Sequence, residues 1–275
     1  MANGRISLNY DLVTKILTSF IKEEVEKIGI KNVVVGLSGG IDSALSATLA
    51  TLALGKDRVY AYALPYKTSS KESLDDAKLV ADFLGVNFEI IEITNFVDPY
   101  FKINPNISNL RKGNVMARMR MIVLFDKSAE VGGIVLGTSN KTELLLGYGT
   151  WYGDLACAIN PIGDLYKTQV WELAEYLNIP KRVIEKKPTA DLWEGQTDEE
   201  ELGFTYRDVD RLLKAMIDDR KDKSELLRMG FTEEFIDNVK ERIRRNQFKR
   251  QLPVIAKISN RTIDKDFRYS RDWGY

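Results

Sequence analysis

The chain has 275 residues, in which 40 lysines and arginines balance 40 aspartates and glutamates, and it contains one cysteine and no histidine. The missing histidine excludes a Ser-His-Asp or Cys-His catalytic unit and any zinc site that depends on imidazole. The single Cys157 excludes an intrachain disulfide and a cysteine cluster, so a bound metal is expected to be a hard cation held by oxygens. The balanced charge argues against a nucleic-acid partner. No apolar run has the length of a membrane span, so we expect a cytoplasmic protein without a membrane partner.

In chain order, apolar residues between Leu8 and Val25 recur every four positions and predict a long first helix that ends at Gly29. The β-branched run at Val33–Leu37 then predicts a buried parallel strand. Three more strands are expected at Val59–Leu64, Phe88–Ile93 and Ile134–Gly137, with helices between them at Asp42–Leu54, Lys71–Leu84 and Lys112–Glu130. This alternation predicts an α/β fold, a Rossmann-like parallel sheet flanked by helices on both faces.

After Pro161 the apolar pattern becomes helical, with faces at Leu165–Leu177, Val209–Ile217 and Phe235–Ile243, which predicts a helical C-terminal part. Between these helices, Lys186–Phe204 mixes proline, glycine and acidic residues and is expected to be a long loop. Long loops in compact domains often cover a binding site. We therefore expect one domain over residues 1–275, with a flexible lid at 191–204 and a C-terminal tail at 246–275.

The segment with the clearest chemistry lies between the first predicted strand and the following helix, and it reads Gly36-Leu37-Ser38-Gly39-Gly40-Ile41-Asp42-Ser43. Adjacent glycines let the backbone bring N–H groups close to an anion, and the helix N-terminus adds further N–H groups and a positive dipole end. A simple capped turn is the alternative interpretation. The octapeptide is neither a Walker A loop nor a dinucleotide fingerprint. It resembles the pyrophosphate-binding loop of the ATP pyrophosphatase family, whose members cleave ATP between the α- and β-phosphates.

Five further segments narrow this resemblance. They occur in the order Gly113–Met121, Gly137–Glu143, Tyr152-Gly153-Asp154, Asn160-Pro161 and Lys187–Leu192. Together with the loop they look like ammonia-dependent NAD synthetase, over roughly residues 5–255. The resemblance implies a ligase that adenylates the carboxylate of deamido-NAD with ATP and amidates it with ammonia, releasing NAD, AMP and pyrophosphate. The alternatives are an ATP-pyrophosphatase-type enzyme that acts on another carboxylate or on RNA, and a non-catalytic nucleotide sensor.

The resemblance also implies roles for individual residues and a cofactor, Mg²⁺, with ATP as co-substrate. Asp42 and Glu143 match the family's metal ligands, and Asp154 is assigned to ammonia handling, with a structural turn aspartate as the equal alternative. The ATP-binding set is Gly36, Leu37, Ser38, Gly39, Gly40, Ile41, Asp42, Ser43, Thr138, Lys167 and Thr189. Without the family match, Thr138 would be interpreted as a helix cap, and Lys167 and Glu143 as solvated helix residues.

The positions that match the deamido-NAD site depart most from the family pattern. They are Arg118, Trp151, Ala158, Phe248 and Lys249. Trp151 stands where many members have lysine, Ala158 where they have aspartate, and Phe248 where they have histidine. All three differences remove a polar group and none affects the ATP loop. Aromatic stacking on a pyridine or adenine ring is the favoured interpretation, and an altered carboxylate substrate is the alternative.

The family is homodimeric, so a homodimer is expected, with the first helix or Lys112–Glu130 as its surface unless these apolar faces are core. Cys157 has no histidine partner and is not expected to hydrolyse glutamine. The nitrogen is therefore expected to come from free ammonia or from a separate glutaminase.

Overall fold

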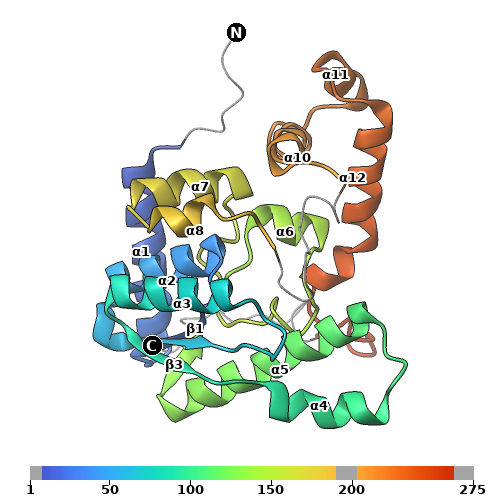
Figure 1. The fold of residues 1–275 in the computed structure, drawn as a ribbon. Coiled ribbons are helices and arrows are strands. Elements are labelled where there is room, and N and C mark those ends of the chain that lie inside the picture. Colours follow the sequence, from blue (N-terminus) through green and yellow to red (C-terminus); the bar gives the residue numbers. More distant parts are fainter. Residues whose placement is uncertain (1–7, 190–202, 263–275) are drawn as a thin grey trace.

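Four short strands form a parallel sheet at the centre of the described residues, which are 8–189 and 203–262 of this computed structural model (Figure 1). The strands are β1 (Asn32–Gly36), β2 (Val59–Ala63), β3 (Asn87–Ile90) and β4 (Gly133–Val135), in the order β3-β2-β1-β4. In the register of the central strand, Val34 lies opposite Tyr60 on β2 and Val135 on β4. The expected Rossmann-like α/β fold with a parallel sheet is confirmed.

Helices cover both faces of the sheet (Figure 1). One face carries α1 (Tyr10–Lys27), α2 (Ile41–Leu54), α3 (Lys71–Leu84), α7 (Lys167–Tyr176) and α8 (Lys181–Glu185), and the other carries α4 (Thr94–Ile103) and α5 (Asn109–Glu130). Successive side chains of a strand point to opposite faces. Val33 and Val35 therefore pack in the core under α2, whereas Val34 packs with Tyr62 in the core under α5.

A second group of helices follows the sheet and has its own core. It consists of α6 (Lys141–Leu146), α10 (Tyr206–Leu213), the π-helical turn η2 (Lys214–Asp218), α11 (Lys223–Arg228) and α12 (Glu233–Arg245). Short 3-10 turns lie at η1 (Lys56–Arg58) and η3 (Gln247–Arg250). Tyr206, Leu212 and Ile236 are fully or almost fully buried where α6, α10 and α12 meet. This arrangement agrees with the predicted helical C-terminal part.

The structure adds elements that the sequence patterns did not predict. Helix α4 contains Pro99, and α6, α8 and α11 are too short to show an apolar period. Helix α5 begins three residues before the expected Lys112 because Ser108 caps it by accepting a hydrogen bond from the backbone N–H of Arg111. The predicted lid lies outside the described residues except for Gly203 and Phe204, and so do residues 263–275 of the predicted tail. Among the described residues, no helix combines the length and apolar character needed to cross a membrane.

Candidate active site

A cavity of about 580 Å³ opens at the carboxyl ends of β1, β2 and β4. After β1 the chain continues to β2 and β3 on one side of it, and then returns to form β4 on the other side of β1. The strand order therefore changes direction at β1. Open parallel sheets bind ligands at this topological switch point. The wall includes Gly36 at the end of β1, Leu64 after β2 and Thr138 after β4, and it also includes Thr189 from the segment that follows α8.

The glycine-rich loop between β1 and α2 holds its own shape through hydroxyl groups. The backbone N–H of Ser38 donates to Ser43 Oγ at 3.2 Å, and Ser43 Oγ donates to the backbone oxygen of Gly40 at 2.9 Å. The N–H of Gly40 donates to Ser38 Oγ at 3.2 Å. Helix α2 begins after Gly40 without a side-chain cap, so its first N–H groups are available to an anion. The loop is therefore arranged for phosphate binding before any ligand enters.

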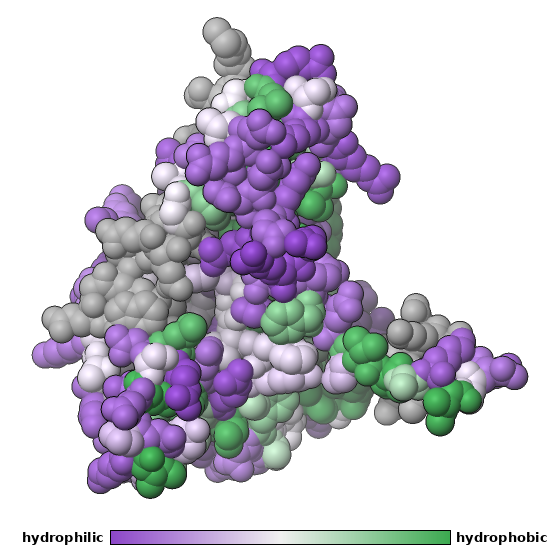
Figure 2. Space-filling model, turned by 90° about the vertical axis from the view of Figure 1, so that its right-hand side faces the viewer, coloured by the Kyte–Doolittle hydropathy of each residue, from purple (hydrophilic) through white to green (hydrophobic). Residues whose placement is uncertain are grey.

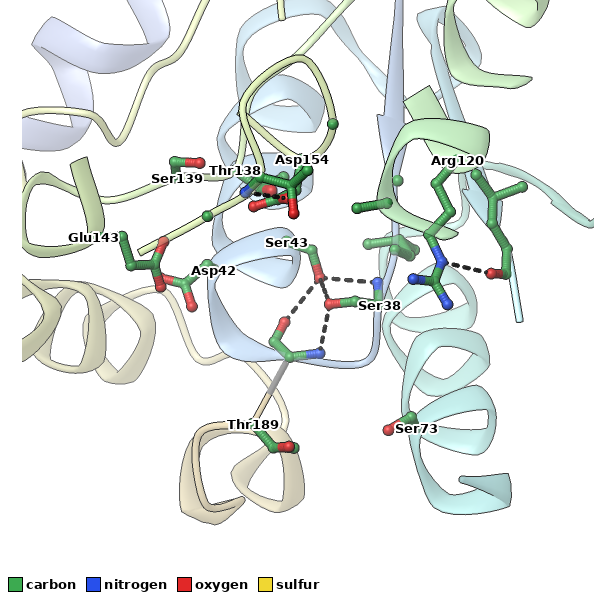
Figure 3. A pocket seen from close by; sticks show the side chains of 18 of the residues that line it. Ser38, Asp42, Ser43, Ser73, Arg120, Thr138, Ser139, Glu143, Asp154 and Thr189 are labelled. Atoms are coloured by element: carbon green, nitrogen blue, oxygen red, sulfur yellow. Dashed lines mark hydrogen bonds between the residues drawn. The ribbon is translucent and has the colours of Figure 1, made fainter. Parts of the chain in front are cut away.

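Asp42, Glu143 and Lys167 meet at one side of the cavity, where Figure 3 shows the two carboxylates turned toward one another. The Lys167 ammonium contacts Asp42 Oδ2 and lies 3.8 Å from Glu143 Oε1. Its side chain is 3% exposed, against 17% for Asp42 and 16% for Glu143. A lysine this buried requires compensating charge, which the two carboxylates supply.

Asn140 connects these residues, although the sequence analysis assigned it no role. Its Nδ2 donates to Asp42 Oδ1 at 2.8 Å, and its Oδ1 accepts from the backbone N–H of Glu143 at 2.9 Å. Glu143 Oε2 in turn accepts from the backbone N–H of Asn140 at 3.3 Å, which completes a capping box at the start of α6. The capping-box pattern was the sequence signal that could have identified Asn140.

The donor set is suited to Mg²⁺. Asp42 accepts two hydrogen bonds, and a carboxylate can accept about four, so its oxygens retain lone pairs for a cation. Mg²⁺ in nucleotide sites is usually held by one or two carboxylates together with substrate phosphates. Within the described residues no cluster of three or more His, Cys, Asp or Glu forms a complete metal cage, so the phosphates would supply the remaining ligands.

Asp154 lies on another part of the cavity wall (Figure 3), and its Oδ1 accepts from the backbone N–H of Thr150 at 2.9 Å. Asp154 is exposed to the cavity. The protein atoms around it nevertheless desolvate the carboxyl group and raise its pKa. Hydrogen bonds with Thr150 and the positive charge of Lys249 act in the opposite direction and lower that pKa. Desolvation lowers the pKa of Lys249, whose Nζ donates to the backbone oxygens of Gly147 at 2.7 Å and Gly149 at 2.9 Å. The region combines a proton acceptor with a nearby cation.

Most of the predicted site residues line this one cavity. They are Gly36, Leu37, Ser38, Gly40, Ile41, Asp42, Ser43, Thr138, Glu143, Asp154, Lys167, Thr189 and Lys249. Gly39 does not contribute to the wall, because it turns toward α3, where an added Cβ would lie 2.1 Å from the backbone oxygen of Ser73.

Four predicted substrate residues lie outside the cavity wall: Arg118, Trp151, Ala158 and Phe248. Trp151 contacts two of the others. Arg118 Nε donates to the backbone oxygen of Trp151 at 3.3 Å, and the Trp151 ring meets the Phe248 ring edge-on at 5.3 Å. Trp151 also stacks on Tyr152 at 4.4 Å. Ala158 is exposed, and its backbone N–H donates to the backbone oxygen of Val135 on β4 at 2.9 Å. Of the three positions with a polar-to-apolar difference, Trp151 and Phe248 contact each other.

The structure places Arg120 in the cavity instead of Arg118, and its Nε donates to the backbone oxygen of Leu64 at 2.9 Å (Figure 3). The two arginines are separated by two positions on α5, so they point in different directions from the helix. Sequence alone showed a basic helix and could not tell which arginine lines the cavity. The orientation of α5 directs Arg120 into it.

The comparison with protein families gives one match that spans most of the chain: the NAD synthase model covers residues 13–253. This chain belongs to the NAD synthase family. It is 60% identical over 271 residues to the NH(3)-dependent NAD(+) synthetase of Trichlorobacter lovleyi, covering 98% of this chain and 99% of that protein.

Among solved structures, the NH3-dependent NAD synthetase from Campylobacter jejuni in complex with the nitrate ion has a TM-score of 0.78 at 39% identity and covers 91% of this chain and 100% of its own. The NMN synthetase from Francisella tularensis has a TM-score of 0.81 at 31% identity and covers 91% and 99%.

Proposed function

We infer that this chain is an ammonia-dependent NAD synthetase, a ligase that uses ATP to amidate deamido-NAD. The observation that carries this conclusion is the 60% identity over 98% of the chain to an enzyme of that name. The glycine-rich loop at the switch point and the adjacent pair of carboxylates agree with ATP chemistry. A sensor would not need two carboxylates beside the phosphate loop, so the enzyme is favoured over the non-catalytic alternative.

In the first half-reaction, the carboxylate of deamido-NAD attacks the α-phosphate of ATP and pyrophosphate leaves. The backbone N–H groups of the glycine-rich loop and of α2 hold the phosphates, while Lys167 places a positive charge beside them. Asp42 and Glu143 would hold Mg²⁺, which when bound neutralises the charge of the phosphates. Thr138 and Thr189 are proposed as further ATP contacts. No covalent enzyme nucleophile is needed, which suits a chain without histidine.

In the second half-reaction, ammonia attacks the adenylated carboxyl carbon and AMP leaves. We assign Asp154 to this step because it is a carboxylate in the cavity wall with a raised pKa. A raised pKa makes a carboxylate a stronger proton acceptor. Asp154 would accept a hydrogen bond from ammonium and take up the proton that ammonium releases.

For the dinucleotide we propose Arg118 and Lys249 as charged contacts and the pair Trp151 and Phe248 as a stacking surface. Phe248 is 51% exposed, so its ring is accessible to a base. Ala158 is also proposed to lie at the dinucleotide site, where it offers no polar group. The NMN synthetase neighbour motivates a second candidate, amidation of the corresponding mononucleotide.

One assay separates these candidates. The purified protein is incubated with ATP, Mg²⁺ and ammonium, together with either deamido-NAD or the deamidated mononucleotide, while AMP and the amidated product are measured. The inference requires NAD and AMP in equal amounts and a higher kcat/KM for the dinucleotide. Preferential amidation of the mononucleotide would support the second candidate, and AMP without an amidated product would indicate another acceptor.

We also propose a homodimer, a nitrogen supply from free ammonia or a separate glutaminase, and a cytoplasmic location. The side chains of Phe96, Tyr100, Ile103 and Leu110 are 43–75% exposed at α4 and the start of α5. Figure 2 shows hydrophobic side chains interspersed with hydrophilic ones in the lower part of one face. Exposed apolar patches mark interaction sites. Sedimentation at several concentrations tests the dimer, and replacing ammonium with glutamine in the assay tests the nitrogen source.

A further inference from the structure

A buried carboxylate from the second group of helices reaches the base of the active site. Asp210 on α10 is 0% exposed and accepts three hydrogen bonds. Its Oδ1 accepts from Thr142 Oγ1 at 2.6 Å, and its Oδ2 accepts from both the backbone N–H and the Oγ1 of Thr168 at 2.8 Å. A carboxylate so far from water is stabilised only by such donors and by nearby positive charge.

The partners of Asp210 are the direct neighbours of two proposed phosphate-handling residues. Thr142 precedes Glu143 in the first turn of α6, and Thr168 follows Lys167 in the first turn of α7. Thr142 Oγ1 donates to Asp210 and also accepts from the backbone N–H of Lys167 at 3.0 Å. One carboxylate therefore ties together the N-terminal turns that carry both side chains.

The same helix also contacts the lysine side chain. Tyr206 lies one turn before Asp210 on α10, and the Lys167 ammonium is 5.4 Å from the centre of its ring. Trp171, whose ring meets Tyr206 edge-on, lies at 5.9 Å from the same ammonium. A cation over an aromatic face is attracted by the ring quadrupole. Helix α10 thus holds the backbone of Lys167 through Asp210 and Thr142, and contacts its ammonium group through the Tyr206 ring.

We propose that Asp210 is a positioning residue for ATP, which fixes the first turns of α6 and α7 so that Glu143 and Lys167 converge on Asp42 and the phosphates. This role rests on the proposed function of the cavity. The hydrogen bonds from Thr142 and Thr168 place the two helices relative to each other, and their loss would let each helix end shift. The Lys167 side chain is 3% exposed and its ammonium contacts Asp42, so a small shift of α7 would separate the pair.

The test is Asp210→Asn, which keeps the size of the side chain and removes its charge and one acceptor atom. Equilibrium binding of ATP with Mg²⁺ is measured by calorimetry, and steady-state kinetics give kcat for NAD formation. Misplacement of reacting groups by about 1 Å costs on the order of 10²-fold, so we expect kcat to fall by about that factor. The Kd for ATP should rise about 10-fold, while the Kd for deamido-NAD stays within about 2-fold.

Two control variants separate positioning from stability. Val239→Ala removes packing in the same second core, at a buried position of α12, and should lower Tm without weakening ATP binding. Asp208→Asn makes the same substitution at an exposed position of α10, where the carboxylate accepts a hydrogen bond from the hydroxyl of the N-cap residue Thr205. This variant should leave ATP binding unchanged. A selective loss of ATP affinity in Asp210→Asn alone is a result that a merely structural role would not produce.

If Asp210→Asn fails to fold, Thr168→Val decides the question, because it removes one hydroxyl donor to Asp210 and keeps the backbone N–H. We expect a smaller change in the same direction, about 3-fold in the Kd for ATP. The proposal is overturned if the folded variant tested keeps its ATP affinity and kcat within about 2-fold of wild type. Should the wild-type chain bind ATP but make no NAD, the proposed function fails, and the ATP affinities still test the role of Asp210.

Discussion

The substitution Gly39→Ala tests how the phosphate loop is held against the rest of the fold. Gly39 has φ +78°, in the left-handed region, and an added Cβ would lie 2.1 Å from the backbone oxygen of Ser73. Real Cβ contacts essentially never fall below 3.0 Å, so the loop and the first turn of α3 must separate by at least about 0.9 Å. A flexible side chain could move aside, but the obstacle here is backbone.

Because the N–H groups proposed to bind the phosphates belong to this loop, the displacement should weaken catalysis. A misplacement of about 1 Å costs on the order of 10²-fold, which corresponds to about 2.7 kcal/mol of transition-state stabilisation. Left-handed backbone at alanine adds ~1–2 kcal/mol of destabilisation. For a chain of this size each kcal/mol lowers Tm by roughly 2–4 °C. We therefore expect a loss in kcat/KM for ATP together with a lower Tm.

Gly29→Ala is the matched control. Gly29 has φ +70°, and an added Cβ would meet no heavy atom within 4 Å. The control variant carries the same backbone strain without the collision, so Tm should fall while kcat/KM for ATP stays unchanged. The assay is the formation of AMP and NAD, with Tm measured on the same preparations. If Gly39→Ala kept its kcat/KM within about 3-fold of wild type, the argument from misplacement would be refuted.

Three further predictions concern the carboxylates of the cavity. Asp42→Ala should retain the fold and lose AMP and NAD formation by more than about 10³-fold, and near-normal AMP production would contradict the metal assignment. Asp154→Asn should keep ATP–pyrophosphate exchange and slow amide formation by about 10²-fold, whereas a parallel fall of both rates would rule out its role in ammonia handling. The same variant should change the dependence of stability on pH. Desolvation raises the pKa of Asp154 above the unfolded value of about 3.9, so the folded protein retains a proton that the unfolded chain releases as the pH increases. Wild-type stability should therefore fall relative to Asp154→Asn as the pH rises from about 4 through the folded-state pKa, and a Tm difference that stays constant from acidic to neutral pH would contradict this.

The predicted elements agree with the structure where a single side-chain period extends over several turns or over a whole strand. Lys71–Leu84 was predicted as a helix and α3 has the same bounds. Helix α4 was not predicted, because its ten residues contain a proline and leave Phe96 and Tyr100 exposed. Its position is stabilised by packing on α5 through Val97, a contact between segments that the local pattern does not encode.

The sequence by itself predicted a phosphate-binding loop, since the glycines, the hydroxyl groups and the start of the following helix lie within eight residues and act through local geometry. Tertiary structure decided which charged and polar side chains from distant segments meet this loop. Lys167 and Asn140 are separated from Asp42 by 125 and 98 positions, yet both bind its carboxylate. The order β3-β2-β1-β4 brings them together, because parallel strands place their carboxyl ends at one edge of the sheet. Helix orientation likewise directs Arg120 into the cavity, and the packing of α10 buries Asp210 beneath the site. These relationships depend on how whole elements pack, which no local run of residues specifies.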